Sequence, residues 1–279
     1  MTDSSNRYPR LTKSFKGKYP FKIGTTSFIY PDYFIPNVRM LGPYLDEIEL
    51  LLFESDSVDS LLSKSVISDL IQLSENLNLT YNIHLPTDIS ISDPDPKKQQ
   101  RAVDILMRVI DQTADLLPST CTLHVPYINL SFEEGTIRKW QDMVCNHLGN
   151  ILTKGIPPEK LAIENLDYPI EILAGIIERL NLAICLDVGH LIVHGYDIQS
   201  IFNNYSELIP ILHLHGVDNC RDHLALDRLP ERLLRTVISI LKNFKGTVSL
   251  EVFCFQHLDT SLKFLDLGWN NEKEDIRII

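Results

Sequence analysis

The sequence contains no apolar stretch that approaches the roughly 20 residues that a helix needs to cross a bilayer. Residues 1–19 form a polar, basic leader that lacks the apolar segment of a secretory signal. Cysteine is also scarce, at five residues of 279, and the cysteine spacing matches no zinc ribbon. We therefore expect a cytoplasmic protein with reduced cysteines and no membrane partner.

Basic residues are outnumbered by acidic ones. The chain has 26 Lys and Arg against 37 Asp and Glu, which gives a net charge of -11. Because nucleic-acid affinity rests mainly on neutralised phosphates, this balance argues against an unselective nucleic-acid partner. No GxGxxG motif follows the first predicted strand, which weakens a dinucleotide-binding interpretation.

The chain shows no linker that would divide it, so we expect one domain over residues 1–279 with a charged, peripheral tail at 270–279. Short apolar runs, typical of buried parallel strands, recur along this domain. They cover residues 21–23, 48–53, 79–83, 121–125, 161–163, 182–186, 211–214 and 248–253.

Segments with helical periodicity follow most of these runs. The clearest cover residues 58–77, 97–116, 132–152 and 231–241. Strand signals that alternate with helical ones predict an α/β protein. Eight such units in 279 residues favour a single closed (β/α)8 TIM barrel over an open doubly wound sheet.

Six consecutive predicted strands finish in a residue that can bind a divalent cation. These residues are His84, His124, Glu164, Asp187, His215 and Glu251, at intervals of 40, 40, 23, 28 and 36 residues. Each interval is about one β/α unit, and the carboxyl ends of barrel strands converge on one face. The pattern therefore predicts a metal site at that face.

The residue types support the same prediction. Without a cation, Glu164, Asp187 and Glu251 would repel one another at the barrel mouth. Imidazole and carboxylate ligands suit Zn, Mn, Fe or Co, and no thiolate cluster is present. His190, three residues after Asp187, and His223, beyond the seventh strand, bring the candidate ligands to eight. Eight ligands favour two or three ions over one.

The other histidines are interpreted as structural. His194 and His213 lie near the predicted ligands in the sequence, and we expect them to support or pack around the site. His147 and His257 have no such placement, so we expect them in structural or surface positions.

The ordered set of ligand-type residues resembles the xylose-isomerase-like superfamily, which includes endonuclease IV and sugar-phosphate isomerases and epimerases. In the endonuclease branch, the resemblance implies one zinc ion at the positions of His84, His124 and Glu164. It implies a second ion at the positions of Glu164, Asp187, His215 and Glu251.

The same resemblance implies a third ion, held in part by His190 and His223. The superfamily pattern adds an aspartate two residues before the last histidine, where this chain has Arg221. Asp218 or Asp222 could replace that carboxylate. The sequence therefore leaves open whether the third site is present.

Further segments are similar to one branch of the superfamily, the cobamide-remodelling phosphodiesterase family CbiR. These segments cover residues 24–31, 81–86, 164–169, 215–217, 221–224 and 250–253. Members hydrolyse the phosphoester in the nucleotide loop of cobamides, the relatives of vitamin B12, to give a cobinamide phosphate and the lower-ligand nucleoside. The resemblance thus implies a metal-dependent phosphodiesterase with a small-molecule corrinoid substrate.

The chemistry expected for such a protein is phosphodiester hydrolysis assisted by divalent cations. Glu164 or Glu251 would orient or deprotonate the attacking water, and the planar guanidinium of Arg221 would bind the phosphate. A single-metal sugar isomerase or epimerase is the main alternative. An endonuclease for abasic DNA and a binding protein without turnover are further alternatives. The negative charge disfavours the first of these, and the nearly complete ligand set disfavours the second.

Overall fold

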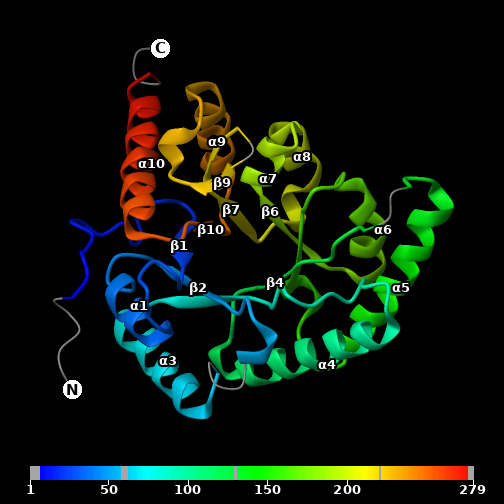
Figure 1. Cartoon of the computed structure of the whole chain (residues 1–279). Helices are drawn as coiled ribbons and strands as arrows, with labels where there is room; N and C mark the ends of the chain where they lie inside the picture. Colours follow the sequence, from blue (N-terminus) through cyan, green and yellow to red (C-terminus); the bar gives the residue numbers. More distant parts are fainter. Residues whose placement is uncertain (1–6, 58–61, 129–130, 220, 276–279) are drawn as a thin grey trace.

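The strands form a closed barrel in this computed structural model, which describes residues 7–57, 62–128, 131–219 and 221–275. Eight parallel strands are arranged in the order β1-β10-β7-β6-β5-β4-β3-β2 (Figure 1). They are β1 (Lys22–Thr26), β2 (Glu47–Leu51), β3 (Thr80–His84), β4 (Cys121–Leu123), β5 (Leu161–Glu164), β6 (Ala183–Asp187), β7 (Ile211–Leu214) and β10 (Thr247–Leu250). This arrangement confirms the predicted (β/α)8 TIM barrel.

Helices surround the barrel and alternate with its strands (Figure 1). They are α1 (Phe34–Leu41), α3 (Lys64–Leu77), α4 (Pro96–Thr113), α5 (Glu134–Leu152), α6 (Glu171–Leu180), α7 (Val188–Val193), α8 (Ile198–Tyr205), α9 (Glu231–Asn243) and α10 (Phe255–Asp275). Short 3₁₀ turns cover Ser55–Ser57, Ala114–Leu116, Pro158–Lys160, Ser206–Leu208 and Leu226–Arg228. A two-stranded antiparallel hairpin, β8 (Gly216–Asp218) and β9 (Arg221–Leu224), follows β7.

Local sequence explains where the helices begin. In α4, the Asp95 side chain accepts a hydrogen bond from the Lys97 backbone N–H, and Pro96 occupies the first helical position. In α3, the Ser63 side chain accepts from the Val66 backbone N–H in the same way. This helix therefore starts later than the predicted segment 58–77, whose residues 58–61 lie outside the described part of the chain.

Apolar residues fill the barrel interior below the polar strand ends. One buried cluster on β5, β6 and β7 comprises Ala162, Ala183, Cys185 and Ile211. Because strand side chains alternate between faces, the next inward positions on these strands are Glu164, Asp187 and His213. The fold therefore directs ionisable groups into the barrel one layer above this apolar floor.

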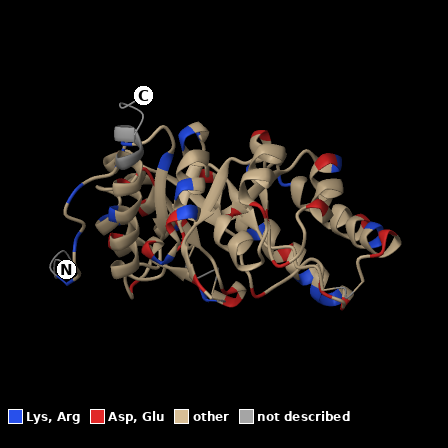
Figure 2. Cartoon of the chain, turned by 90° about the horizontal axis from the view of Figure 1, so that it is seen from above, with Lys and Arg blue, Asp and Glu red and all other residues tan. Residues whose placement is uncertain are grey.

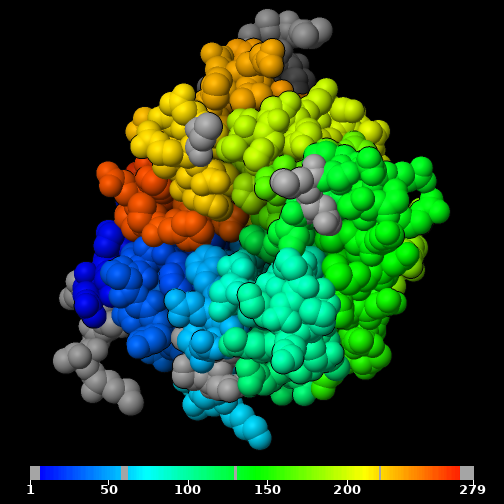
Figure 3. Space-filling view, turned by 45° about the vertical axis from the view of Figure 1, so that its right-hand side comes forward, coloured from blue at the N-terminus to red at the C-terminus, as the bar shows by residue number. Residues whose placement is uncertain are grey.

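The two ends of the described chain pack against each other. Figure 3 shows the blue N-terminal part beside the orange-red C-terminal part, and β1 pairs with β10. Phe15 and Tyr19 of the predicted polar leader are buried, and the Tyr19 ring meets Trp269 edge-on. Within the predicted charged tail, residues 270–275 continue α10, and residues 276–279 lie outside the described part of the chain. The N-terminal segment, although polar in composition, is therefore held against α10 by aromatic packing.

Acidic and basic residues are interspersed over the outer helices (Figure 2). Among the residues that the structure describes, no helix has the length and apolar character required to cross a membrane. The described cysteines, Cys121, Cys145, Cys185 and Cys254, are free thiols. Cys220 lies outside the described residues.

Candidate metal centre

Glu164, at the end of β5, lies at the centre of the polar strand ends and is 1% exposed. Its Oε2 atom lies 3.2 Å from Nε2 of His84 and 2.9 Å from Nε2 of His124. The ligand atoms of these three residues all lie within 4.8 Å of one another. The structure therefore brings together the three residues that the superfamily resemblance assigns to one ion.

A second group shares Glu164. Ligand atoms of Glu164, Asp187, His213 and Glu251 lie within 4.8 Å of one another, and all four residues are buried. Nδ1 of His213 lies 3.1 Å from Oε2 of Glu251 and 3.7 Å from Oε1 of Glu164. The two oxygens of Glu164 thus face different groups of ligand atoms.

His213 occupies the place in this group that the superfamily resemblance implies for His215. The register of β6 and β7 pairs His213 with Asp187, so both side chains point inward at the same level. His215 lies after the end of β7, where the chain enters the β8–β9 hairpin. Because His213 and His215 are two residues apart, both side chains point to the same side of the extended chain. Only the strand register shows that His213, rather than His215, lies level with Asp187.

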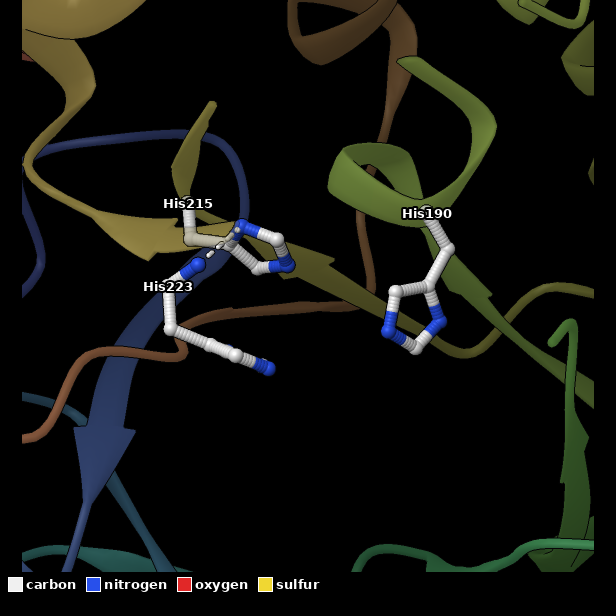
Figure 4. A group of neighbouring side chains, drawn as sticks. All are labelled: His190, His215 and His223. Atoms are coloured by element: carbon white, nitrogen blue, oxygen red, sulfur yellow. Dashed lines mark hydrogen bonds between the residues drawn. The ribbon is translucent and has the colours of Figure 1, made fainter. Parts of the chain in front are cut away.

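His215 contacts Asp187 instead. Its Nε2 atom lies 3.2 Å from Oδ1 of Asp187, and its Nδ1 atom accepts a hydrogen bond of 3.0 Å from the backbone N–H of His223 (Figure 4). A neutral ring that accepts at Nδ1 carries its proton on Nε2, so His215 donates to Asp187.

A third group consists of His190, His215 and His223, whose rings face a common space (Figure 4). Nδ1 of His190 donates to the Asn165 carbonyl at 3.0 Å, and Nδ1 of His223 donates to the Glu251 carbonyl at 3.1 Å. These bonds leave the Nε2 atoms of both rings with a free lone pair, which is the state in which histidine binds a metal. The structure thus brings His190 and His223 together.

Arg221 lies on the hairpin that carries His223. Its side chain is 74% exposed, and its guanidinium is 3.0 Å from Oδ2 of Asp218. Within the described ranges, neither Asp218 nor Asp222 joins a group of potential ligands. The described structure therefore brings neither carboxylate to His190 and His223, and the third residue beside them is His215.

The remaining histidines have other contacts. His194 is the C-cap residue of α7, and Nε2 of His147 lies 3.2 Å from the side-chain oxygen of Gln99. Nδ1 of His257 donates to the His223 carbonyl at 3.3 Å. His257 therefore supports the hairpin, and none of the three belongs to a ligand group in the part of the chain described.

Glu49 on β2 is a site residue that the sequence analysis does not single out. It is fully buried, and its Oε1 atom lies 3.0 Å from Nε2 of His213. With His84 and His213 it forms a further group of potential ligands. The sequence pattern that could have identified Glu49 is the alternation of Glu47 and Glu49 with apolar residues. This alternation places both carboxylates on the same face of the strand.

The charges in the centre fit a bound cation. Burial alone would raise the pKa of Glu164, but His124 and His213 hold it well below its usual range. Burial opposes a charge on His84, yet Glu164 raises the pKa of that ring to about 9. Among the described residues, Oε2 of Glu251 and both ring nitrogens of His213 lie close to charged neighbours but lack hydrogen-bond geometry. Buried polar atoms without hydrogen bonds are costly, and a divalent cation would bind them as ligands.

The comparisons with known proteins agree with this architecture. Residues 39–274 match the family described as xylose isomerase-like TIM barrel. A curated relative, a probable endonuclease 4 from Natronomonas pharaonis, is 23% identical over an alignment of 163 positions, and the match covers 48% of this chain and 52% of the relative. The chain thus spans about half the length of that relative.

Solved structures share the fold at low sequence identity. A D-tagatose 3-epimerase-like protein has a TM-score of 0.75 and 18% identity, covering 92% of this chain and 100% of its own. Endonuclease IV from Thermus thermophilus has a TM-score of 0.69 and 16% identity, covering 90% and 99%. An IolI protein with a bound zinc atom has a TM-score of 0.68 and 14% identity, covering 92% and 98%. The chain belongs to the xylose isomerase-like TIM barrel family.

Proposed function

We propose that the protein is a metal-dependent phosphodiesterase that cleaves the nucleotide loop of cobamides to give a cobinamide phosphate and the lower-ligand nucleoside. The observation that carries the hydrolytic part is Glu164, whose Oε2 faces His84 and His124 while its Oε1 faces His213. Adjacent ligand groups that share a carboxylate suit the two-metal hydrolysis of phosphoesters. The choice of a cobamide follows from the sequence segments that resemble the cobamide-remodelling family.

We assign two or three divalent ions, of Zn, Mn, Fe or Co, to the groups of ligand atoms. The proposed ligands are His84, His124 and Glu164 for one ion, Glu164, Asp187, His213 and Glu251 for another, and His190 and His223 for a third. Bound ions would polarise the phosphoryl oxygens and lower the pKa of water, to about 7 in zinc sites. His213 replaces His215 in this assignment because a ring nitrogen of His213 lies within 4.8 Å of the ligand atoms of Glu164, Asp187 and Glu251.

The protein side chains would orient the reactants. Glu251, which is buried and lies 3.1 Å from Nδ1 of His213, would orient the attacking water through its carboxylate. Glu164 would belong to both of the first two ligand groups and so fix their distance from each other. His215 would orient the Asp187 carboxylate through a hydrogen bond from its Nε2–H. Arg221, exposed on the β8–β9 hairpin, would bind the phosphate through its planar guanidinium.

The proposal can be tested by anaerobic incubation of the metal-reconstituted protein with adenosylcobalamin or pseudocobalamin, followed by chromatography and mass analysis. We expect a cobinamide phosphate that no longer forms after chelation. Glu164→Gln should abolish the product while circular dichroism still reports a folded barrel. Glu178→Gln, at an exposed position on α6, is the matched control and should keep activity. Near-wild-type turnover by Glu164→Gln would refute the proposed role of the shared carboxylate.

A single-metal sugar isomerase or epimerase is the second candidate. The likeness to a D-tagatose 3-epimerase-like protein and the four-residue group around Glu164 favour it. Against it stand His84, His124, His190 and His223, which one-metal chemistry does not require. Metal analysis separates the two: one ion per chain would favour isomerisation, and two or three would favour hydrolysis.

DNA is a less favoured substrate. The net charge of -11 argues against tight binding to a phosphate backbone. We therefore expect no cleavage in a nicking assay on a duplex with an abasic site. Rapid nicking would move the assignment to the endonuclease branch.

A further inference from the structure

Three phenylalanines form an aromatic shelf beside the metal centre, after the neighbouring strands β1, β2 and β10 (Figure 1). The rings of Phe28 and Phe53 are 5.4 Å apart, and those of Phe53 and Phe253 are 5.9 Å apart. Phe53 lies 6.4 Å from the His84 ring, and Phe253 lies 4.9 Å from the His223 ring. The shelf thus borders two of the proposed ligand groups.

The shelf is apolar and yet exposed. Phe28 is 41% exposed and Phe253 is 39% exposed, in a protein whose other apolar side chains are mostly buried. Phe28 and Phe53, together with Tyr33, line a cavity of about 640 Å³. Small-molecule sites commonly have volumes of about 300 to 1,000 Å³. Exposed aromatic surface next to a polar centre indicates a binding surface rather than core packing.

The charges around the cavity restrict what it can bind. Asp32 and Glu54 line it, and no basic residue does so within the described chain. Two carboxylates repel a phosphate, but they accept hydrogen bonds from amino, ring N–H or hydroxyl groups. The cavity therefore suits an uncharged, flat group that carries hydrogen-bond donors on itself or on an attached sugar, linked to a phosphate that is held at the neighbouring metal centre.

We propose that the aromatic shelf binds the planar heteroaromatic base of the nucleoside, while the phosphoester to be cleaved lies at the ligand groups. This inference rests on the proposed function and names the part of the substrate that is recognised. Stacking of a base on an aromatic side chain changes affinity by about fivefold to 150-fold when the ring is removed. Because every base has a flat face, the shelf would accept several lower-ligand bases.

Phe28 is the ring to test, since Phe53 and Phe253 adjoin proposed ligand histidines. Phe28→Ala should raise the KM for the cobamide at least about fivefold and leave kcat within about twofold. Phe28→Tyr keeps the ring and should restore the KM. Phe132→Ala is the matched control: Phe132 is 58% exposed, stacks on Tyr127 and does not line the cavity. Its KM should equal that of the wild type.

Binding of the free nucleoside separates this inference from hydrolysis. Saturation-transfer NMR would use metal-loaded protein with adenosine and with the riboside of 5,6-dimethylbenzimidazole. Signals that weaken in Phe28→Ala, in a protein that leaves cobamides intact, would support the shelf and refute the hydrolytic proposal. Hydrolysis with an unchanged KM in Phe28→Ala would refute the shelf alone. Absence of both nucleoside binding and turnover would refute both.

Discussion

Gly189 in α7 offers a sharp test of how His215 is held in the site. A Cβ atom at this position would lie 1.9 Å from Cε1 of His215 and 2.4 Å from both ring nitrogens. Since ordinary contacts are 3.4–4 Å, the ring would have to move by about 1.5–2 Å. The ring would then lose its contacts with Asp187 and with the His223 N–H, which are 3.2 Å and 3.0 Å long.

The cost of Gly189→Ala follows from those contacts. A neutral hydrogen bond contributes about 1 kcal/mol and one to a charged group about 1.5–3 kcal/mol. The better helical preference of alanine offsets about 0.5–1 kcal/mol. We therefore expect a net loss of about 1.5–3.5 kcal/mol in the free energy of unfolding.

Urea unfolding of the metal-free protein, followed by circular dichroism, measures this loss. Gly149→Ala is the matched control, because Gly149 lies in α5 and a Cβ there would meet nothing within 4 Å. That variant should be more stable by about 0.5–1 kcal/mol. Equal unfolding midpoints for the two variants would refute the claim that Gly189 leaves room for His215 against Asp187.

Three further predictions concern metal affinity and stability. His213→Gln should weaken metal binding by more than about 100-fold and His215→Gln by about 10- to 100-fold, because only the first removes a proposed ligand. Titration against a competing chelator checks this, and the reverse order would contradict it. Metal affinity should rise with pH, since the pKa of His84 is about 9 and its proton must leave before the ring binds an ion. A pH-independent affinity by the same titration would count against His84 as a ligand. Asp266→Asn should lower the free energy of unfolding by about 1 kcal/mol. Burial opposes a charge on this carboxyl, but its ion pairs with Lys13 and Lys18 outweigh burial and lower the pKa of Asp266. That stability is present above the unfolded-state pKa of about 3.9 and is lost as pH falls through the folded value, so urea midpoints of variant and wild type should converge in acid.

The barrel could be predicted because its strands are buried on both faces and read as apolar runs. The run 211–214 coincides with β7, whereas the run 248–253 extends past the end of β10 at Leu250. Val252 and Phe253 are apolar for a different reason: they belong to the loop beside the metal centre, where Phe253 joins the aromatic shelf. Apolar character alone does not separate a strand from such a loop.

The site could be predicted only in part. Carboxylates and histidines at strand ends are visible as single residues, which is why Glu164 was found. The choice between His213 and His215 depends on strand register, which sequence spacing does not determine. Glu49 was missed because it lies within an apolar run, and the hairpin was missed because its short strands carry no apolar pattern.

The central claim is that the metal centre hydrolyses a phosphoester rather than moving a proton beside a carbonyl. It is tested most directly by giving the same metal-loaded protein a cobamide and a ketohexose, D-tagatose, in parallel reactions in D₂O. We predict release of cobinamide phosphate and nucleoside, with no deuterium in the sugar. Incorporation of deuterium into the sugar, with the cobamide left intact, would contradict the hydrolytic account and identify an epimerase.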